Sequence, residues 1–284
     1  MNNLTERKYW DDGYLRTDRG AALPDLDDFR HTPDKRIVEA LEALDLKGKV
    51  ILELGAGDSD ILLILSRRWG SVSRFVGLDY SDTGCTSLSR RANAVGVDVS
   101  VVQADMFCAP KDLTHKFDIV YSVGLVEHFA QLESVLACKR RFLKPGGVIL
   151  TVIPNMSGLI GKLAKRFNKA VYDIHNPHNM RSFLDGHARA GLEVVRSGYL
   201  CSTNFGVLSA CFEASGAPGW KFYVFLSRLS KASWLFESKI TELPKTAFLS
   251  PYLYAVSHVK AGMADDTSTR ERSEGGAGAG RCPS

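Results

Sequence analysis

Short apolar runs alternate with helical segments over the first half of the chain, and this alternation limits the possible folds more than any other feature. Five apolar runs are expected to be buried strands, at 50–54, 75–78, 99–102, 117–122 and 148–153. Most of the segments between and before them have helical spacing, at 32–47, 61–68, 83–94 and 132–142. Strands separated by helices predict an α/β, Rossmann-like doubly wound fold with a parallel sheet covered on both faces.

The pattern loosens after Pro154. The stretches 155–180 and 200–250 are irregular and are expected to be insertions that form a helical cap over the substrate. Between them, 182–190 is expected to be a helix and 192–195 a strand, and 252–259 reads as the last strand. The domain organisation is therefore an N-terminal arm at 1–30, a main domain at 31–262 and a polar tail at 263–284 that is expected to be disordered.

Composition excludes several classes of protein. The chain has 284 residues and a formal net charge of +4, which is too weak to indicate a nucleic-acid partner. The six cysteines are scattered, and none forms a Cys-x-x-Cys pair, as expected in a reducing compartment. No signal peptide and no apolar stretch long enough to cross a bilayer is evident, so we expect a cytoplasmic protein without stable membrane insertion.

A glycine-rich loop follows the first expected strand, in the segment Glu53-Leu54-Gly55-Ala56-Gly57. Glycine allows a tight turn and a close approach of the backbone to a ligand, and the free amides of the following helix favour an anionic group. A dinucleotide-binding loop has a third glycine, but this position is Asp60 here. The loop therefore predicts a ligand other than a dinucleotide.

Acidic residues end the next two strands. Asp79 follows Gly57 at roughly the spacing at which an acid meets a ribose in doubly wound folds, and the alternative is an acid that caps the next helix. Asp105 is placed to accept a hydrogen bond from an adenine amino group, with Met106 as an apolar wall, unless it is an ordinary turn residue. The fourth strand brings Ser122 and Val123 to the crevice where ligands bind in such sheets, so both are expected to line the cofactor.

Together with the turn Lys144-Pro145-Gly146-Gly147, these motifs resemble the class I S-adenosylmethionine-dependent methyltransferases over about residues 35–200. The resemblance implies a seven-stranded sheet whose last strand is antiparallel, and S-adenosylmethionine as cofactor. It implies that the cofactor is held at the methionine part by Glu53, Gly55 and Gly57, at the ribose by Asp79, and at the adenine by Asp105 and Met106. Tyr9 and Trp10 resemble the aromatic arm that some small-molecule members fold over the cofactor.

We therefore expect methyl transfer to a small-molecule acceptor, as in secondary metabolism. His128 faces the expected substrate side and is the leading general base, because an unperturbed histidine titrates near neutral pH; the alternative is that it caps or packs on its helix. His175 and His178 either touch the substrate or belong to a polar turn. Some quinone-pathway O-methyltransferases have a metal-binding Glu-x-x-Glu-His segment, but Gly124 replaces the first acid here, so no required metal is expected.

Other interpretations stay open. The aromatic residues of 155–180 and 200–250 either wall a substrate pocket or bury one another. The basic run from Lys162 to Lys169 either meets a membrane surface or is a solvated helix face. A methyltransferase acting on a lipid-linked or saccharide acceptor at the membrane face is the second function, and a non-catalytic binding protein or a nicotinamide dehydrogenase are the remaining ones. The sequence does not indicate an oligomeric state.

Overall fold

A computed structural model describes residues 3–16, 19–212 and 219–260. Seven strands form one sheet: β1 (Val50–Leu54), β2 (Arg74–Asp79), β3 (Ser100–Gln103), β4 (Phe117–Val123), β5 (Leu143–Pro154), β6 (Leu192–Leu200) and β7 (Tyr252–Val259). The helices are α1 (Arg7–Arg16), α2 (Thr32–Glu42), α3 (Asp60–Trp69), α4 (Asp82–Val95), α5 (Leu132–Arg140), α6 (Leu159–Phe167), α7 (Lys169–Asp173), α8 (Met180–Arg189) and α9 (Trp220–Lys239). The predicted disordered tail at 263–284 lies outside the described residues.

The strands are ordered β3-β2-β1-β4-β5-β7-β6. Strands β1 to β5 pair in parallel, and β7 is antiparallel to both of its neighbours, β5 and β6. This order confirms the predicted Rossmann-like α/β sheet with an antiparallel last strand. The carboxyl ends of β1, β2 and β4 meet at one edge of the sheet, where Leu54 lies beside Leu78, so the loops that follow these strands share one side of the molecule.

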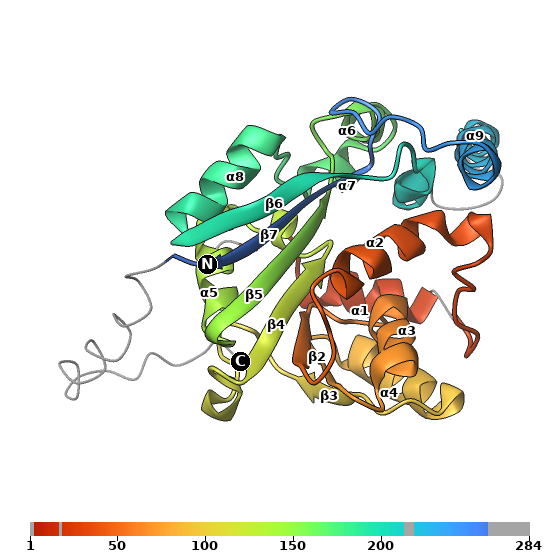
Figure 1. The fold of residues 1–284 in the computed structure, drawn as a ribbon. Coiled ribbons are helices and arrows are strands. Elements are labelled where there is room, and N and C mark those ends of the chain that lie inside the picture. Colours follow the sequence, from red (N-terminus) through yellow and green to blue (C-terminus); the bar gives the residue numbers. More distant parts are fainter. Residues whose placement is uncertain (1–2, 17–18, 213–218, 261–284) are drawn as a thin grey trace.

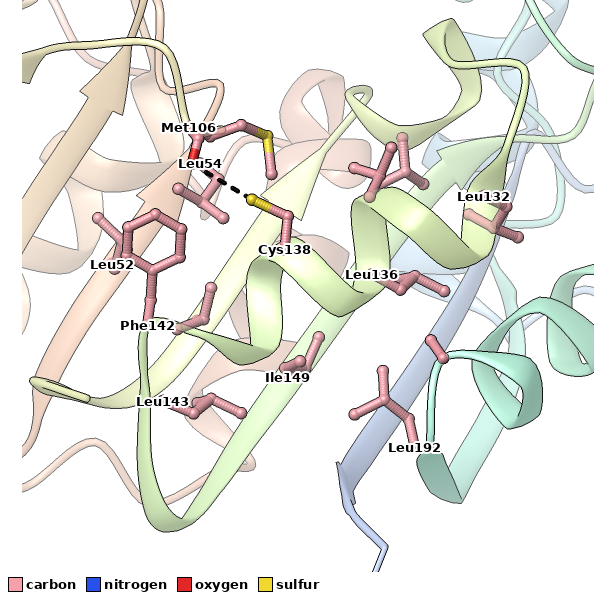
Figure 2. Close-up of a cluster of buried hydrophobic side chains, with 14 of the residues drawn as sticks. Leu52, Leu54, Met106, Leu132, Leu136, Cys138, Phe142, Leu143, Ile149 and Leu192 are labelled. Atoms are coloured by element: carbon pink, nitrogen blue, oxygen red, sulfur yellow. Dashed lines mark hydrogen bonds between the residues drawn. The ribbon is translucent and has the colours of Figure 1, made fainter. Parts of the chain in front are cut away.

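Two apolar layers hold helices against the sheet. Helices α2, α3 and α4 cover one face, with Leu41, Leu62 and Leu88 fully buried beneath them. Helices α5 and α8 cover the other face (Figure 1), where Leu136 and Phe183 are fully buried. Figure 2 shows side chains of α5, including Leu136 and Cys138, packed over residues of β1 and β5. These layers fix the position of the loops at the sheet edge.

Element boundaries differ from the sequence-based prediction at several ends. The helix predicted at 32–47 does begin at Thr32, with His31 at the N-cap, but it ends at Glu42, well before Gly48. Strand β6 continues to Leu200, beyond the predicted end at Val195, because it pairs with β7 along its whole length past a register shift at Val194 and Arg196. Pairing with a neighbour extends the strand through residues that show no apolar alternation.

Two appendages leave the sheet. The N-terminal arm contains α1, which packs against α4. The predicted cap stretches contain α6, α7, the 3-10 helix η4 (Phe205–Cys211) and α9. Their apolar side chains form a separate small core among themselves, of Met156, Ile160, Ala164, Phe205, Leu208, Cys211, Phe212 and Leu226. The cap stretches therefore bury one another.

Candidate functional site

The glycine loop after β1 has the backbone geometry that a ligand-binding turn requires. Gly55 and Gly57 have φ of +71° and +43°, a region that residues with a side chain rarely adopt. A Cβ at Gly55 would lie 2.9 Å from Leu125 Cδ1, so a side chain there would collide with the neighbouring loop. The amides of Gly55 and Ala56 donate to the carbonyl of Leu78, at 2.9 and 3.2 Å, which ties the loop to the end of β2.

Asp79 joins this loop to the start of α4. Its two carboxylate oxygens accept hydrogen bonds from the amides of Gly57 (2.7 Å) and Ser81 (2.8 Å). The N-cap of α4 is Ser81, whose hydroxyl accepts from Gly84, so the alternative interpretation of Asp79 as the cap is wrong. Burial raises the pKa of Asp79, and the two amides act against this rise. Asp79 also lines the adjoining cavity, and a carboxylate can accept more hydrogen bonds than these two amides donate.

A cavity of about 430 Å³ opens at this edge of the sheet. Among the predicted cofactor residues, Gly55, Asp79, Asp105, Met106 and Trp10 line it. No residue of 155–180, and no described residue of 200–250, is in the lining, so the cap stretches do not wall this cavity. Its remaining lining is largely apolar and aromatic and includes Tyr14, Phe107, Val123, Leu125 and Phe129. The volume and this mixture of surfaces suit a small organic ligand.

Glu53, Gly57 and Ser122 are not among the residues that line the cavity. Ser122 is fully buried and accepts a 2.8 Å hydrogen bond from Nζ of Lys139, while its neighbour Val123 is in the lining. Glu53 is also buried and accepts a hydrogen bond from the Tyr121 hydroxyl. Burial raises the pKa of Glu53 to about 8. Asp105 shows both predicted features, because it lines the cavity and also accepts from the amide of Phe107 at 2.9 Å within its turn.

Helix α1 lies over the cavity. Trp10 and Tyr14 stand one helical turn apart on α1, and both line the cavity. Asp11 anchors the helix, because its carboxylate accepts from the hydroxyls of Ser81 and Thr83 at the start of α4. The prediction identified Trp10 and Tyr9 but missed Tyr14, which the four-residue spacing from Trp10 would have indicated. Tyr9 is exposed and packs edge-on against Trp10.

A second polar cluster lies beside the cavity, formed by Glu127, His128 and His175. One donor atom from each lies within 4.8 Å of the others, which makes this a candidate metal-binding group. The Nδ1 atoms of His128 and His175 face the backbone carbonyls of Ile174 (2.8 Å) and Val171 (2.7 Å). Since a carbonyl only accepts, both Nδ1 atoms carry the proton and both Nε2 atoms keep a lone pair.

Burial controls the charges of this cluster. It lowers the pKa of His128 to about 3, with a further contribution from His175, and raises the pKa of Glu127 to about 8. Oε2 of Glu127 has no hydrogen-bond partner among the described residues.

His128 does not line the cavity; Trp10 does, and its ring packs edge-on against His128 at 4.9 Å between centroids. His178 lies apart from the cluster, with Nδ1 3.4 Å from the Ser182 hydroxyl.

Comparison with known proteins supports the resemblance noted from the sequence. A family model described as a methyltransferase domain matches residues 51–147. A ubiquinone biosynthesis O-methyltransferase of Rhizobium etli (strain CIAT 652) is 31% identical over 121 residues, which cover 42% of this chain and 46% of that protein. The corresponding protein of Pseudomonas entomophila (strain L48) is 26% identical over 38% of this chain and 45% of its own length. The chain thus spans less than half the length of the curated relatives it matches.

Solved structures show the same fold. A putative sarcosine dimethylglycine methyltransferase from Galdieria sulphuraria superposes with a TM-score of 0.57 at 15% identity, over 89% of this chain and 98% of that one. Geranyl diphosphate C-methyltransferase from Streptomyces coelicolor A3(2) gives 0.55 at 17% identity, over 79% and 77%. With the strand order and the glycine loop, the match of residues 51–147 to a methyltransferase domain supports a class I S-adenosylmethionine-dependent methyltransferase.

Proposed function

We propose that this protein transfers the methyl group of S-adenosylmethionine to a small-molecule acceptor in the cavity beside Gly55. One observation carries the proposal: the glycine loop, the acids after β2 and β3, and Trp10 of the arm all border the same cavity. A backbone cradle that a Cβ would fill, next to two carboxylates, fits a cationic ligand with a ribose and an adenine. When bound, S-adenosylmethionine supplies an electrophilic methyl group.

Each part of the cofactor has a proposed partner. Asp79 holds the ribose hydroxyls, Asp105 and Met106 hold the adenine, and the loop from Glu53 to Gly57 holds the methionine part. The protein's main contribution is to orient the acceptor and to exclude water, since the methyl group is already activated. Helix α1 provides the exclusion by covering the cavity with Trp10 and Tyr14.

The acceptor is proposed to be a small molecule with an apolar or aromatic part, as in secondary metabolism. Support comes from the cavity wall, where Phe107, Leu125 and Phe129 provide apolar surface. The names of the relatives agree with an acceptor of this kind, because they concern ubiquinone biosynthesis and geranyl diphosphate.

The proposed base is His128, acting through its free Nε2. Glu127 Oε1 lies 3.7 Å from this atom, close enough to stabilise the imidazolium that forms when His128 takes a proton, once Glu127 has lost its own proton. Trp10 lines the cavity and contacts the ring of His128, which does not line it, so the proposal requires that the arm moves for the acceptor to reach Nε2. His175, whose ring lies 4.6 Å from that of His128, is proposed to border the acceptor as well.

Calorimetry with S-adenosylmethionine tests the cofactor assignment. The wild-type chain should bind, and Asp79→Ala should weaken binding at least ~10-fold by removing charge-assisted hydrogen bonds. Asp82→Ala is the matched control, because Asp82 is an exposed acid in the next helix outside the cavity lining. Absence of binding would favour a non-catalytic protein, and binding of a nicotinamide dinucleotide instead would favour a dehydrogenase.

The base is tested separately. His128→Ala should lower turnover by ~10²-fold or more while leaving the affinity for S-adenosylmethionine unchanged. His178→Ala, which removes a histidine outside the cluster, should leave turnover near that of the wild type. Unchanged turnover in His128→Ala would remove this residue from the mechanism without affecting the cofactor assignment.

A further inference from the structure

Helix α9 carries apolar side chains on two of its faces. One face packs into the cap core and contains the buried residues Leu226, Ser230 and Trp234. A second set of apolar residues recurs at intervals of three, four, seven and four residues, which places them on one side of a helix and its end. This outer stripe consists of Phe222, Phe225, Leu229, Phe236 and Ile240.

All five residues of the outer stripe are exposed, and Phe225 and Leu229 have 60% and 49% of their surface accessible. Figure 1 shows α9 at the periphery of the molecule, away from the sheet. The stripe continues onto α6, because the exposed ring of Phe167 lies 5.4 Å from that of Phe222. Of fourteen exposed large apolar residues in the described chain, nine lie on α6, on α9 or between Ile240 and Leu249. Such clustering marks an interaction surface.

Cationic residues flank the outer stripe on the side away from the cap core. Lys221, Arg228 and Lys239 each directly precede a stripe residue, and all three are exposed. In the part of the chain that the structure describes, none of the three has an ion-pair partner. On α6, Lys162, Lys165 and Arg166 are exposed too. The apolar surface is therefore bordered by unpaired positive charge.

The positive charge of the chain is concentrated in this region. The stretches 155–180 and 200–250 contain nine Lys and Arg against four Asp and Glu, a net charge of +5. The whole chain has 36 − 32 = +4, so the rest of the chain carries a net −1. This asymmetry makes the cap stretches, and not the rest of the surface, the favoured place for an anionic partner to bind.

We propose that the outer stripe of α9 docks the protein on an anionic lipid bilayer, with the helix lying in the plane of the interface. Apolar side chains flanked by lysine and arginine along one exposed side of a helix are the pattern of interfacial helices. The stripe inserts among the acyl chains, and the flanking cations meet lipid phosphates. A second copy of this chain fits less well, because pairing two such faces brings like charges together.

The docking does not depend on methyl transfer, since it uses residues outside the cavity. It does give the enzyme a place to meet acceptors that partition into membranes. Co-sedimentation tests it, with vesicles of phosphatidylcholine alone and of phosphatidylcholine mixed with phosphatidylglycerol. The wild-type chain should bind the mixed vesicles, and added salt should weaken this binding.

Two variants separate the contributions of the surface. Phe225→Glu with Leu229→Glu should lower binding to mixed vesicles at least ~10-fold, because two inserted side chains are lost. Lys221→Gln, Arg228→Gln and Lys239→Gln together should weaken binding to the mixed vesicles and reduce its salt dependence. Val195→Glu is the matched control, as an exposed apolar residue (57%) on β6, and should bind as the wild type does.

Three results would overturn the proposal. The first is that the wild-type chain binds neither kind of vesicle. The second is that the variant with Phe225→Glu and Leu229→Glu binds mixed vesicles as well as the wild type does. The third is a wild-type dimer in light scattering that the same variant converts to a monomer, which would make the outer stripe a subunit interface. Circular dichroism of each variant confirms that exposed substitutions leave the fold intact.

Discussion

The hydroxyl of Tyr121 donates a 2.8 Å hydrogen bond to Oε2 of Glu53, linking β4 to β1 directly behind the glycine loop. Both side chains are buried. Burial raises the pKa of Glu53 to about 8, so the carboxyl group holds its proton at neutral pH when no cation is near. A cationic ligand in front of the loop favours the ionised form and lowers this pKa again.

Binding of S-adenosylmethionine should therefore release a proton near pH 7, and its affinity should rise as pH increases toward 8. Calorimetry in buffers of different ionisation enthalpy measures the release directly. Glu53→Gln cannot ionise, so it should bind more weakly and show no buffer dependence. A binding heat that is the same in all buffers for the wild-type chain would contradict a protonated Glu53.

The same shift predicts how stability depends on pH. The folded pKa of Glu53 lies above its unfolded value, so its contribution is fully present below the ordinary carboxyl pKa and is lost as pH rises through about 8. The ligand-free protein should lose stability between about pH 5 and 8. Glu53→Gln should flatten this part of the profile in denaturant unfolding, although Glu127, which is shifted in the same direction, still contributes.

Gly57 is the position where the arm comes closest to the loop. A Cβ there would lie 1.8 Å from Oη of Tyr14, and its φ of +43° is unfavourable for any side chain. Gly57→Ala should lower the affinity for S-adenosylmethionine ~10-fold or more by displacing the arm or the loop. Adding Tyr14→Ala removes the collision but not the backbone strain, so affinity should not return fully.

Gly146→Ala provides the control for Gly57→Ala. Gly146 has a φ of +75°, but nothing lies within 4 Å of a Cβ built there. The substitution should cost stability through backbone strain of ~1 kcal/mol and leave ligand affinity unchanged. Equal affinities for the Gly57→Ala and wild-type proteins would show that Tyr14 does not cover the loop when the ligand binds.

Local patterns in the sequence predicted the parallel part of the sheet because each strand there is an apolar run between turn signals. Gly55, Asp79 and Asp105 could be assigned to one site, since the carboxyl ends of parallel strands share an edge. The direction of β7 did not follow from its own residues, because a strand has the same alternation whether it pairs in parallel or antiparallel. It came from the family resemblance.

Contacts between distant segments could not be predicted. His175 belongs to the cap stretches and His128 to the loop after β4, and their contact depends on how α6 and α7 fold back onto that loop. Ser122 was predicted to line the cofactor, but strand alternation turns it toward Lys139 and turns Val123 toward the cavity. Lysine is usually exposed, so the sequence around Lys139 does not predict that this side chain is buried.

Turnover should not require a divalent cation. Gly124 replaces the first acid of the metal-binding Glu-x-x-Glu-His segment, so one ligand of that segment is missing. Protein treated with EDTA and dialysed should contain no stoichiometric metal in elemental analysis and should retain its turnover. The opposing outcome is a bound zinc or iron ion that is absent from the His175→Ala protein and present in the His178→Ala protein. This result would make Glu127, His128 and His175 a metal centre.

Arg91 should be the largest single ionic contribution to the stability of the glycine loop. It is buried in α4 and forms ion pairs with Asp58, at 2.8 Å, and with Asp60. Its Nε also donates to the carbonyl of Gly20 in the arm, at 2.9 Å. Asp60 occupies the place of the third glycine in a dinucleotide loop, so this pairing accounts for the departure from that motif.

Arg91→Met should lower the free energy of unfolding by about 3–5 kcal/mol, because buried Asp58 is left without a partner. Arg68→Met is the control: its ion pair with Glu42, at 2.8 Å, is at the surface and is worth only about 0–1 kcal/mol. Denaturant unfolding compares the two. Similar small losses in both variants would mean that Asp58 is readily solvated when Arg91 is removed. The loop would then be held by the hydrogen bonds that its amides donate to the Leu78 carbonyl and the Asp79 carboxylate.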